Sequence, residues 1–571
     1  MSSYVRTGRK RPIALRRLSA FPAIAALLLL IPLVSSTYAS ILGKGTEGSL
    51  YSTIVNEQAH RKLGAASPAM VENFYRSYGY RRMWTDGVLP KTSIIDLIEA
   101  IRRAKDHGLN VNDYNLKLLE DKLSELVLNK WRGNPGPSSL ANEVEILATD
   151  SFLSYGSDML LGRARPETLM EDIRDNGVSG ELMALLYDTL SSGDIANSVE
   201  GLSPSDNEYR KLQGALELYR LVKARGGWPT VSGPLKVGNR SWKVRNLRAR
   251  LRATGDLGPD EPLNSPVFDN ELKQAVIRFQ KRQGLPATGF VGKQTVSAMN
   301  VSVNERIEII KLNMERLRWM PVYSASKLII VNLTDFSLRL IRNSRTELEM
   351  KVIIGKDYSN TPDFTTKVTA IVLNPSWHVP RSIAVEEMLP RFKANPGLVN
   401  DIGMELYASS SYKGSPVDPS EIEWDRYNSS NFPYWLKRKP GNGSPLGKIK
   451  FIMPNKHSIY LHDTPRGKLF NRSERALSHG CIRLERPMDL AEKLLEDSGW
   501  DMKKLTRTVD KGREEAIRLK DSVMVQMVYR TSWVDDMGRV HFRKDVYGYD
   551  DKLAEQMRTG NARTLELLAA N

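Results

Sequence analysis

The strongest constraint on the fold is a change in hydrophobic spacing part-way along the chain. Between residues 67 and 221, apolar side chains recur at helical intervals, as in Ile94, Leu97 and Ile98. From Leu328 onward they fall into short apolar runs bounded by turn residues, which is typical of strands. A chain of 571 residues is also too long for one hydrophobic core. The sequence therefore predicts a multidomain α+β protein.

The N-terminus has the layout of an export signal. Six basic residues precede an apolar run at 18–34, and no acidic residue occurs before residue 40. Thr37 and Ala39 fit a cleavage site. We expect residues 1–39 to be a signal peptide or an uncleaved signal-anchor, followed by a polar tether at 40–66. The rest of the chain is then exported, either free or tethered to the membrane by this segment.

Composition restricts the classes of protein and partner. Hydrophobic residues make up 41% and charged residues 26% of the chain, which argues against a polytopic membrane protein. The net charge of +17 suits an anionic polymer or membrane surface, but solubility explains it equally well. Basic and acidic residues are interleaved without an aromatic–basic pattern, so we expect no nucleic-acid partner. Membrane contact is expected only if the N-terminal segment stays uncleaved.

Breaks rich in glycine, proline and asparagine divide the rest of the chain into predicted units. A helical scaffold spans 67–230, and a compact helical segment spans 237–300. A mostly β domain covers 325–509, and its strand pattern is interrupted by an aromatic-containing insertion at 390–447. Residues 510–571 are predicted to form a C-terminal hairpin extension and tail. A long insertion inside a β domain is usually functional or disordered, and its aromatic residues argue against disorder.

The compact segment at 237–300 has two apolar helical faces, one with Val244 and Leu247, the other with Val276 and Phe279. It resembles the small three-helix peptidoglycan-binding module. The residues that carry this resemblance are Ala275-Val276, Phe279-Gln280, Gly284-Leu285 and Thr288-Gly289. The resemblance implies binding to the cell wall, and a helical spacer is the alternative interpretation.

The chain has one cysteine, so it cannot form an internal disulfide, and the thiol is either buried packing or reactive. Its neighbourhood favours reactivity. Cys481 follows His479 and Gly480, and His462 ends a predicted strand upstream. An imidazole can accept the proton of a thiol whose ordinary pKa is about 8.5, which creates a nucleophile. Backbone N–H groups around Gly480 and Cys481 would hold the resulting oxyanion.

The residues after the cysteine suggest a substrate contact. If the backbone is extended, His479, Cys481 and Arg483 point to one face. Arg483 would then hold a substrate carboxylate through paired hydrogen bonds. His479 and Cys481 are two possible ligands for a soft metal, but a third and fourth are not evident, and no His-Glu-x-x-His occurs. We therefore expect no metal and no cofactor.

A histidine followed 19 residues later by the cysteine of Ser478-His479-Gly480-Cys481 resembles the L,D-transpeptidase motif. Further segments resemble the large periplasmic L,D-transpeptidases of Gram-negative bacteria. They are Asn374–Pro380, Gly355-Lys356, Thr361-Pro362, Pro440-Gly441, Leu446–Phe451, Asn313–Pro321 and Phe542–Asp550. The resemblance covers most of residues 67–550.

The resemblance implies roles for individual residues. Cys481 would be the nucleophile and His462 the general base, oriented by the backbone carbonyl at Asp463. His479, Gly480 and Arg483 would complete the oxyanion and substrate surface, and the insertion at 390–447 would be a capping loop over the site. The other candidates for substrate contact are Ser478, Tyr460, Asp463, Trp424 and Trp435. Packing is the alternative for Tyr460 and for at least one tryptophan.

The implied function is a transpeptidase that links diaminopimelate residues of peptidoglycan, releasing D-Ala from tetrapeptide stems. Expected partners are stem peptides, glycan and cell-wall synthesis proteins, and carbapenems should acylate Cys481. The same site would act as an L,D-carboxypeptidase with water, or attach an envelope protein with a protein amine. A non-enzymatic wall-binding scaffold is a third interpretation, disfavoured by the intact motif.

Overall fold

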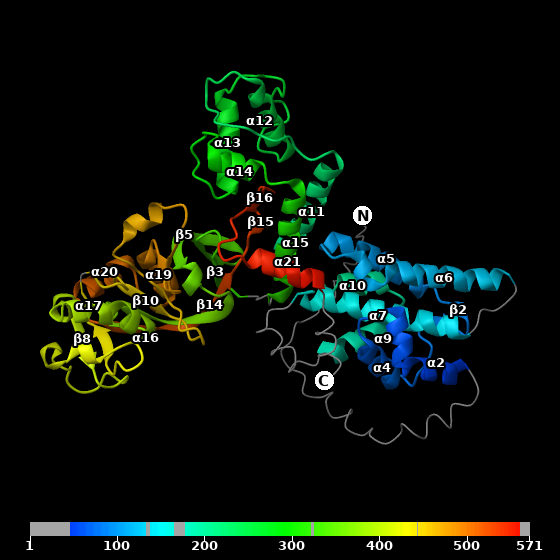
Figure 1. Cartoon of the computed structure of the whole chain (residues 1–571), viewed down its shortest axis with the longest axis horizontal. Helices are drawn as coiled ribbons and strands as arrows, with labels where there is room; N and C mark the ends of the chain where they lie inside the picture. The colour runs from blue at the N-terminus through cyan, green and yellow to red at the C-terminus, as the bar shows by residue number, and fades with distance from the viewer. Residues whose placement is uncertain (1–45, 133–137, 165–177, 321–324, 442, 560–571) are drawn as a thin grey trace, which may run out of the picture.

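The computed structural model of the chain describes residues 46–132, 138–164, 178–320, 325–441 and 443–559. The predicted leader, the first residues of the predicted tether and the tail after residue 559 lie outside these ranges. Within them, the predicted multidomain α+β fold is confirmed. Figure 1 shows a helical region at the N-terminal end, a small helical module standing apart and a strand-containing domain. In the described part of the chain, no helix has the length and apolarity needed to cross a membrane.

The N-terminal region is a bundle of helices around one central helix, α7 (Ser138–Leu161), which is buried from Leu140 to Met159 except at Glu143. The helices around it are α2 (Thr46–Ile54), α3 (Glu57–Leu63), α4 (Pro68–Ser77), α5 (Ser93–Arg102), α6 (Leu116–Trp131), α9 (Val178–Ser192) and α10 (Ile195–Glu200). Leu50 and Leu63 are buried in the same core. The predicted tether is therefore wrong from residue 46 onward, because its apolar side chains pack into the scaffold.

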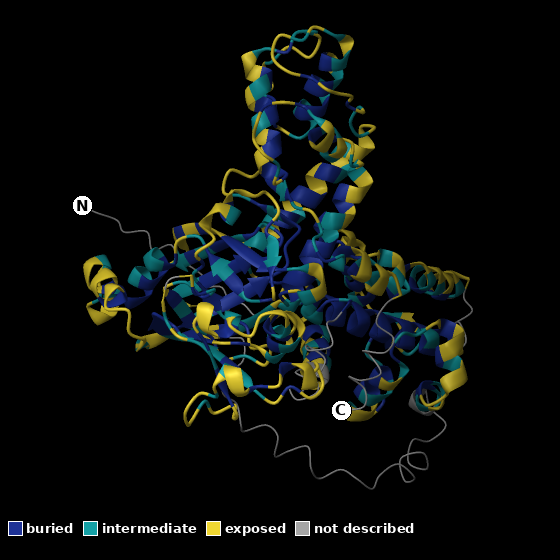
Figure 2. Cartoon of the chain, turned by 60° about the vertical axis from the view of Figure 1, so that its left-hand side comes forward, coloured by how far each residue is buried: buried dark blue, intermediate teal, exposed yellow. Residues whose placement is uncertain are grey.

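The compact module contains α12 (Trp242–Ala253), α13 (Asn270–Arg282) and α14 (Lys293–Met299). Val244, Leu247, Val276 and Phe279 are buried in its core, as the two apolar faces predict. Capping residues help to set where the helices of the module begin. For example, the carboxylate of Asp269 accepts the backbone N–H of Leu272 at 2.8 Å. Figure 2 shows that the outer surface of this module is largely exposed.

A junction connects the module, the scaffold and the strand-rich domain. It consists of α11 (Asn207–Ala224), α15 (Val303–Trp319), the hairpin β15 (Ser532–Val534) and β16 (Val540–Phe542), and α21 (Tyr549–Thr559). Apolar residues of α11, α15 and the hairpin share one core. The buried pair Arg316–Asp550, at 2.6 Å, ties α15 to α21. Helix α11 therefore belongs to the junction, although the sequence assigned it to the scaffold.

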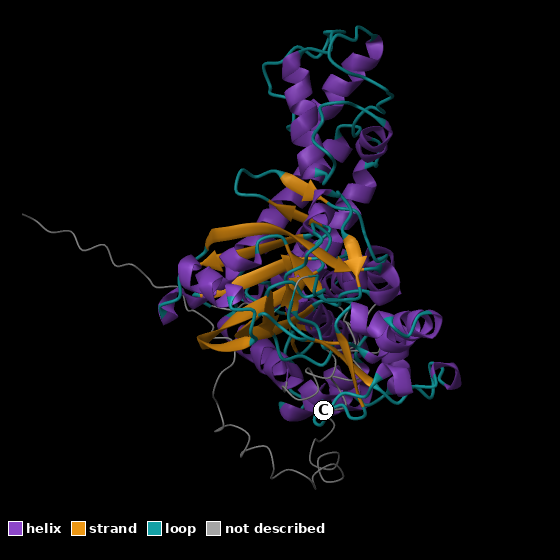
Figure 3. Cartoon of the chain, turned by 90° about the vertical axis from the view of Figure 1, so that its left-hand side faces the viewer, coloured by secondary structure: helices purple, strands orange, loops and turns teal. Residues whose placement is uncertain are grey.

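The strand-rich domain is built on one nine-stranded sheet, whose strands gather in a single block in Figure 3. In sheet order the strands are β12 (Ala476–Ser478), β5 (Arg345–Gly355), β13 (Ile482–Leu484), β11 (Leu461–His462), β10 (Ile449–Ile452), β6 (Phe364–Leu373), β14 (Glu515–Val528), β3 (Lys327–Asn332) and β4 (Ser337–Arg342). Strand β4 also pairs with β5, so the sheet closes on itself. Helices α19 (Pro487–Leu495) and α20 (Met502–Asp510) pack into its core.

Strand β14 corrects the predicted domain boundary at residue 509. The sequence placed residues 523–529 in a terminal hairpin outside the β domain. The structure places β14 inside the sheet, parallel to β3 and antiparallel to β6. The hairpin itself is β15–β16 alone. Residues 523–528 of β14 are all buried except Met524, and Val523, Val525 and Met527 belong to the core of the sheet, which explains the position of the strand.

The insertion forms a small cap with its own core and starts earlier than predicted. Its three-stranded sheet has the order β7 (Trp377–His378), β9 (Trp435–Arg438) and β8 (Met404–Tyr407). Its helical part is α16 (Arg381–Ile383), a π-helical turn (Ala384–Met388), α17 (Leu389–Ala394) and α18 (Leu398–Asp401). Trp377 and Leu446 are buried in one cluster. The predicted range of 390–447 therefore cuts off the first strand of the cap.

Candidate active site

Three neighbouring strands bring the candidate catalytic residues together. Strand β11 lies between β13 and β10, and His462 pairs with Arg483 on one side and with Lys450 on the other. Paired residues share a face of the sheet, and side chains alternate along each strand. Cys481 directly precedes β13, so it lies diagonal to His462 on that face.

The imidazole of His462 is held in one orientation. Its Nδ1 donates to the backbone carbonyl of Asp463 at 2.5 Å, which leaves Nε2 as the basic nitrogen. Burial, with smaller contributions from Arg483 and Lys450, lowers the pKa of His462 to about 3, and the Asp463 carbonyl only partly opposes this. The imidazole is therefore neutral at physiological pH and able to accept a proton.

The side chain of Asp463 is committed to the backbone. Its carboxylate accepts the N–H groups of Lys448 at 2.7 Å and Thr464 at 2.6 Å. These bonds hold the carboxylate against its own loop, and a contact of Asp463 with substrate stays a prediction. Its carbonyl orients His462, as the family resemblance implies.

The thiol of Cys481 is half-buried and lies against Tyr460. Burial raises the pKa of Cys481, and hydrogen bonds from the Tyr460 backbone and hydroxyl oppose this, as do the charges of Lys450 and Arg483. The Lys450 ammonium lies 3.9 Å from the centre of the Tyr460 ring. Tyr460 was a candidate for substrate contact or for packing, and its hydroxyl acts on the thiol by lowering the pKa of Cys481.

The turn before Cys481 is shaped by hydrogen bonds among its own residues. Ser478 Oγ donates to the Cys481 carbonyl at 2.6 Å and accepts the Gly480 N–H at 3.2 Å. Gly480 has φ +107°, a conformation that favours glycine. The chain therefore bends between β12 and β13, so the condition of an extended backbone, under which His479 and Cys481 would share a face, is not met. Ser478 is buried in this turn, so the prediction that it contacts substrate is wrong.

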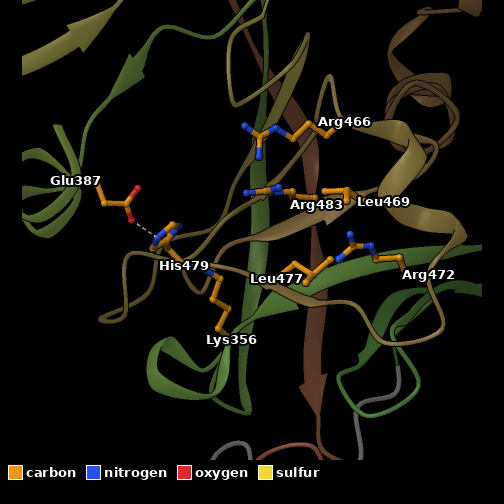
Figure 4. Close-up of a pocket in the computed structure, with 8 residues that line it drawn as sticks. All are labelled: Lys356, Glu387, Arg466, Leu469, Arg472, Leu477, His479 and Arg483. Carbon is orange, nitrogen blue, oxygen red and sulfur yellow. Dashed lines mark hydrogen bonds and ion pairs between the residues drawn. The ribbon is translucent and has the colours of Figure 1, made fainter. Parts of the chain in front are cut away.

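A pocket of about 470 Å³ lies beside the turn. It is lined by Lys356, Glu387, Arg466, Leu469, Arg472, Leu477, His479 and Arg483 (Figure 4). Glu387 comes from the cap, and its carboxylate lies 2.5 Å from His479 Nε2. The guanidinium groups of Arg466 and Arg483 extend side by side in Figure 4. Four Lys and Arg side chains against one carboxylate make this pocket suited to an anionic ligand.

The two tryptophans of the cap do not line this pocket. Trp424 is buried in the cap core and packs against Phe392, with 5.5 Å between ring centres. Its predicted contact with sugar or stem peptide is therefore wrong. Trp435 is half-buried in β9 opposite Tyr407. Among the described residues, no group of three or more His, Cys, Asp or Glu side chains is arranged to hold a metal ion.

Comparison with known families identifies the strand-rich domain. Residues 326–517 match the family described as "L,D-transpeptidase catalytic domain". The chain carries an L,D-transpeptidase catalytic domain. Residues 69–216 match the family described as "Scaffold domain", and residues 241–299 match "Putative peptidoglycan binding domain". The catalytic match ends within β14, beyond the predicted limit at residue 509.

The chain is also similar to individual proteins. A protein of Haemophilus influenzae named "Putative L,D-transpeptidase" is 32% identical over 294 residues, which cover 51% of this chain and 57% of that protein. The match thus spans little more than half of that relative. An L,D-transpeptidase structure from Stackebrandtia nassauensis is 17% identical, with coverage of 52% of this chain and 97% of that chain and a TM-score of 0.22. One from Mycobacterium smegmatis is 13% identical, with coverage of 35% and 59% and a TM-score of 0.16.

The transpeptidase domain also positions its turn through residues whose roles the sequence did not reveal. Thr361 Oγ1 accepts the Gly355 N–H at 3.0 Å and donates to the Gly480 carbonyl at 2.7 Å. The Tyr547 hydroxyl donates to the Gly355 carbonyl at 2.7 Å. A Cβ on Gly355 would lie 2.1 Å from the Ser359 carbonyl oxygen, so this position requires glycine. Gly355, Thr361 and Tyr547 all fall in segments that carry the family resemblance. That resemblance was the signal in the sequence that could have pointed to them.

Replacing Thr361 with valine in the transpeptidase domain should remove both of these hydrogen bonds without changing side-chain volume. We expect the free energy of unfolding to fall by about 1–3 kcal/mol, because a buried N–H and a buried carbonyl lose their partner. Acylation of Cys481 should also slow, since the turn is less constrained. Denaturant unfolding and intact-mass kinetics measure the two effects. Thr369→Val is the control, because the Thr369 hydroxyl makes a long bond of 3.4 Å on a half-buried strand.

The pKa shifts in the transpeptidase domain predict how thiol reactivity depends on pH. The raised pKa of Cys481 and the lowered pKa of His462 leave a neutral thiol beside a neutral imidazole at pH 7. Alkylation by iodoacetamide, which reacts with the thiolate, should therefore rise about tenfold per pH unit between pH 6 and 8. Tyr460→Phe removes a hydrogen bond that lowers the thiol pKa and should move the profile to higher pH. A rate that is flat across this range would indicate a preformed thiolate–imidazolium pair and contradict the assignment.

Proposed function

We propose that this transpeptidase forms peptidoglycan cross-links between diaminopimelate residues through a thioester on Cys481, using tetrapeptide stems as donors and releasing D-Ala. The observation that carries the proposal is the geometry of the thiol. It is half-buried and lies diagonal to a buried, neutral imidazole of fixed tautomer. A cationic pocket adjoins it. This arrangement suits acyl transfer from a substrate that carries carboxylates.

In the first step, Nε2 of His462 accepts the thiol proton as the sulfur attacks the carbonyl carbon between diaminopimelate and D-Ala. Because the Gly480 N–H is directed to Ser478 Oγ, we assign the oxyanion to the N–H of Cys481. The tetrahedral intermediate collapses as the C–N bond breaks. The imidazolium gives its proton to the departing amine of D-Ala, and the thioester remains.

In the second step, the side-chain amine of another diaminopimelate attacks the thioester carbon. His462 accepts the proton of this amine, the C–S bond breaks, and the thiolate takes the proton back from the imidazolium. Water in place of the amine gives L,D-carboxypeptidase activity. A protein amine gives attachment of an envelope protein. The product therefore depends on which nucleophile reaches the thioester: a stem amine, water or a protein amine.

We infer that the protein works in the periplasm, since peptidoglycan is its substrate and the first 39 residues have the layout of an export signal. The module at residues 241–299 supports binding of the wall close to the catalytic domain. Cell-wall synthesis proteins are proposed partners. Cleavage of the leader, tested by N-terminal sequencing of the protein from membrane and soluble periplasmic fractions, would distinguish a free enzyme from an anchored one.

The test of the proposed function is mass analysis of muropeptides formed by purified residues 40–571 on wall rich in tetrapeptide stems. Dimers linked between two diaminopimelate residues should appear together with free D-Ala. Iodoacetamide should abolish the product, and a chelator should leave it unchanged. Tripeptides without dimers would establish the carboxypeptidase instead. Loss of product with the chelator alone would contradict the cysteine mechanism.

A further inference from the structure

His462 lies between two cationic side chains, one on each of the neighbouring strands in the sheet. Lys450 on β10 pairs with His462, which in turn pairs with Arg483 on β13. Because paired residues share a face, both cations lie on the face that carries the imidazole and the thiol. Ile449 and Phe451, which flank Lys450, are buried in the core on the opposite face. The family resemblance implied a role for Arg483 but none for Lys450.

Neither cation has a carboxylate partner among the described residues. The Nε of Arg483 is buried without a hydrogen bond there. The contact found for the Lys450 ammonium is the face of the Tyr460 ring. The nearby Glu514 carboxylate accepts the Ser376 N–H at 2.6 Å. A partly buried charge without a counter-ion is costly, so an anion supplied by a ligand would stabilise both positions.

The two cations lie on different sides of the reacting groups. Arg483 lines the cationic pocket, in which Arg466 and Lys356 also take part (Figure 4). Lys450 does not line this pocket and lies one strand beyond β11. The cap lies on both sides: Glu387 lines the pocket, and His378 on β7 lies near Lys450, whose charge, after burial and Lys437, lowers the pKa of His378. The two cations therefore flank the imidazole of His462, and Arg483 follows Cys481 by two residues.

We propose that Lys450 binds a carboxylate of the acceptor stem peptide, while Arg483 and the cationic pocket hold the donor. This inference rests on the proposed function. In diaminopimelate, the carbon that bears the attacking amine also bears a carboxylate. When the amine is about 3–3.5 Å from the thioester carbon, that carboxylate is necessarily close to the thiol. A cation beside the thiol, on the side away from the donor pocket, is placed to meet it.

The test separates transfer from acylation. Cys481 is first acylated with a donor tetrapeptide, and transfer to an acceptor stem is then measured against hydrolysis of the same thioester. In Lys450→Met, we expect kcat/KM for the acceptor to fall about 10- to 100-fold, as expected for losing a charge-assisted hydrogen bond. The ratio of transfer to hydrolysis should fall by the same factor, since water carries no carboxylate and any effect of the Lys450 charge on His462 acts on both reactions. Lys450→Arg should restore most of the transfer.

Two controls make the result specific to the carboxylate. Lys367→Met removes an exposed lysine from β6 of the same sheet and should behave as wild type. An acceptor whose carboxylate next to the amine is amidated should react slowly with the wild type, and Lys450→Met should cause no further loss. Equal losses with both acceptors would overturn the assignment to the carboxylate.

The outcomes also distinguish the two proposals. If the wild type forms a thioester but never transfers it to a stem amine, the proposed function fails. If the wild type transfers and Lys450→Met has wild-type kcat/KM for the carboxylate acceptor, the assignment of Lys450 alone fails. Equal thiol titration and equal unfolding midpoints of the two proteins confirm that the variant is folded.

Discussion

Replacing Cys481 with alanine is expected to lower the rate of cross-link formation by on the order of 10⁴-fold or more, because no other group can form the thioester. Incubation of the wild type with donor stems should add the mass of the acyl group to the protein, and the variant should gain no mass. The same holds for a carbapenem, which should acylate the wild type once. Muropeptide analysis and intact-protein mass spectrometry measure these outcomes.

The single cysteine gives this experiment an internal control. A thiol reagent should titrate one group per chain in the wild type and none in the variant. Since Cys481 is half-buried, its replacement should leave the unfolding midpoint nearly unchanged. Cross-links formed by a folded Cys481→Ala protein at the wild-type rate would refute the mechanism. Cross-links lost together with the fold would require the more conservative Cys481→Ser.

Replacing His462 with asparagine should slow acylation at pH 7 by roughly 10²–10⁴-fold, the usual contribution of a general base. The ratio of the wild-type acylation rate to that of the variant should itself depend on pH. Without the imidazole only the thiolate attacks, and the raised pKa of Cys481 keeps that form scarce at pH 7. The rate of the variant should therefore rise about tenfold per pH unit toward the thiol pKa. Single-turnover acylation followed by mass spectrometry over pH 6–9 measures this.

His457→Asn is the matched control for this second prediction. His457 is exposed, lies in the same domain and packs against Phe364 rather than against the thiol. Its replacement should leave acylation unchanged at every pH. A His462 variant whose deficit is constant from pH 6 to 9 would show that the residue supports the structure of the site without accepting the proton.

The chemistry of the site was predictable because it is local in sequence. Cys481 and the turn before it are contiguous, and His462 lies on the adjacent strand of a short parallel pair. The motif did not reveal that Ser478 and Asp463 bond to nearby backbone groups, as short polar side chains in turns commonly do. The alternation of β10 was a signal for Lys450, since a lysine between two buried apolar residues must face away from the core.

The fold was predictable where periodicity is strong and less so where pairing is long-range. Helical spacing predicted the scaffold and the module. It did not predict α2 and α3, which pack into the scaffold core, because the sequence around Leu50 is polar. Domain limits depend on tertiary partners. Strand β14 pairs with β3 and β6 across most of the domain sequence, and Trp377 joins the cap by pairing with β9. Such pairings have no local signature.

The position of β14 also bears on how the catalytic domain is made. The segment that fills the middle of the sheet is among the last of its strands to be synthesised, and Met524 meets Leu328 only then. Until that moment, β3 and β6 each present an open edge, which is a template for aggregation. Contacts between such distant segments also form slowly. A nascent chain that stops before residue 515 would therefore yield an insoluble fragment instead of a weakened enzyme, and folding should benefit from chaperones that bind the unfinished domain.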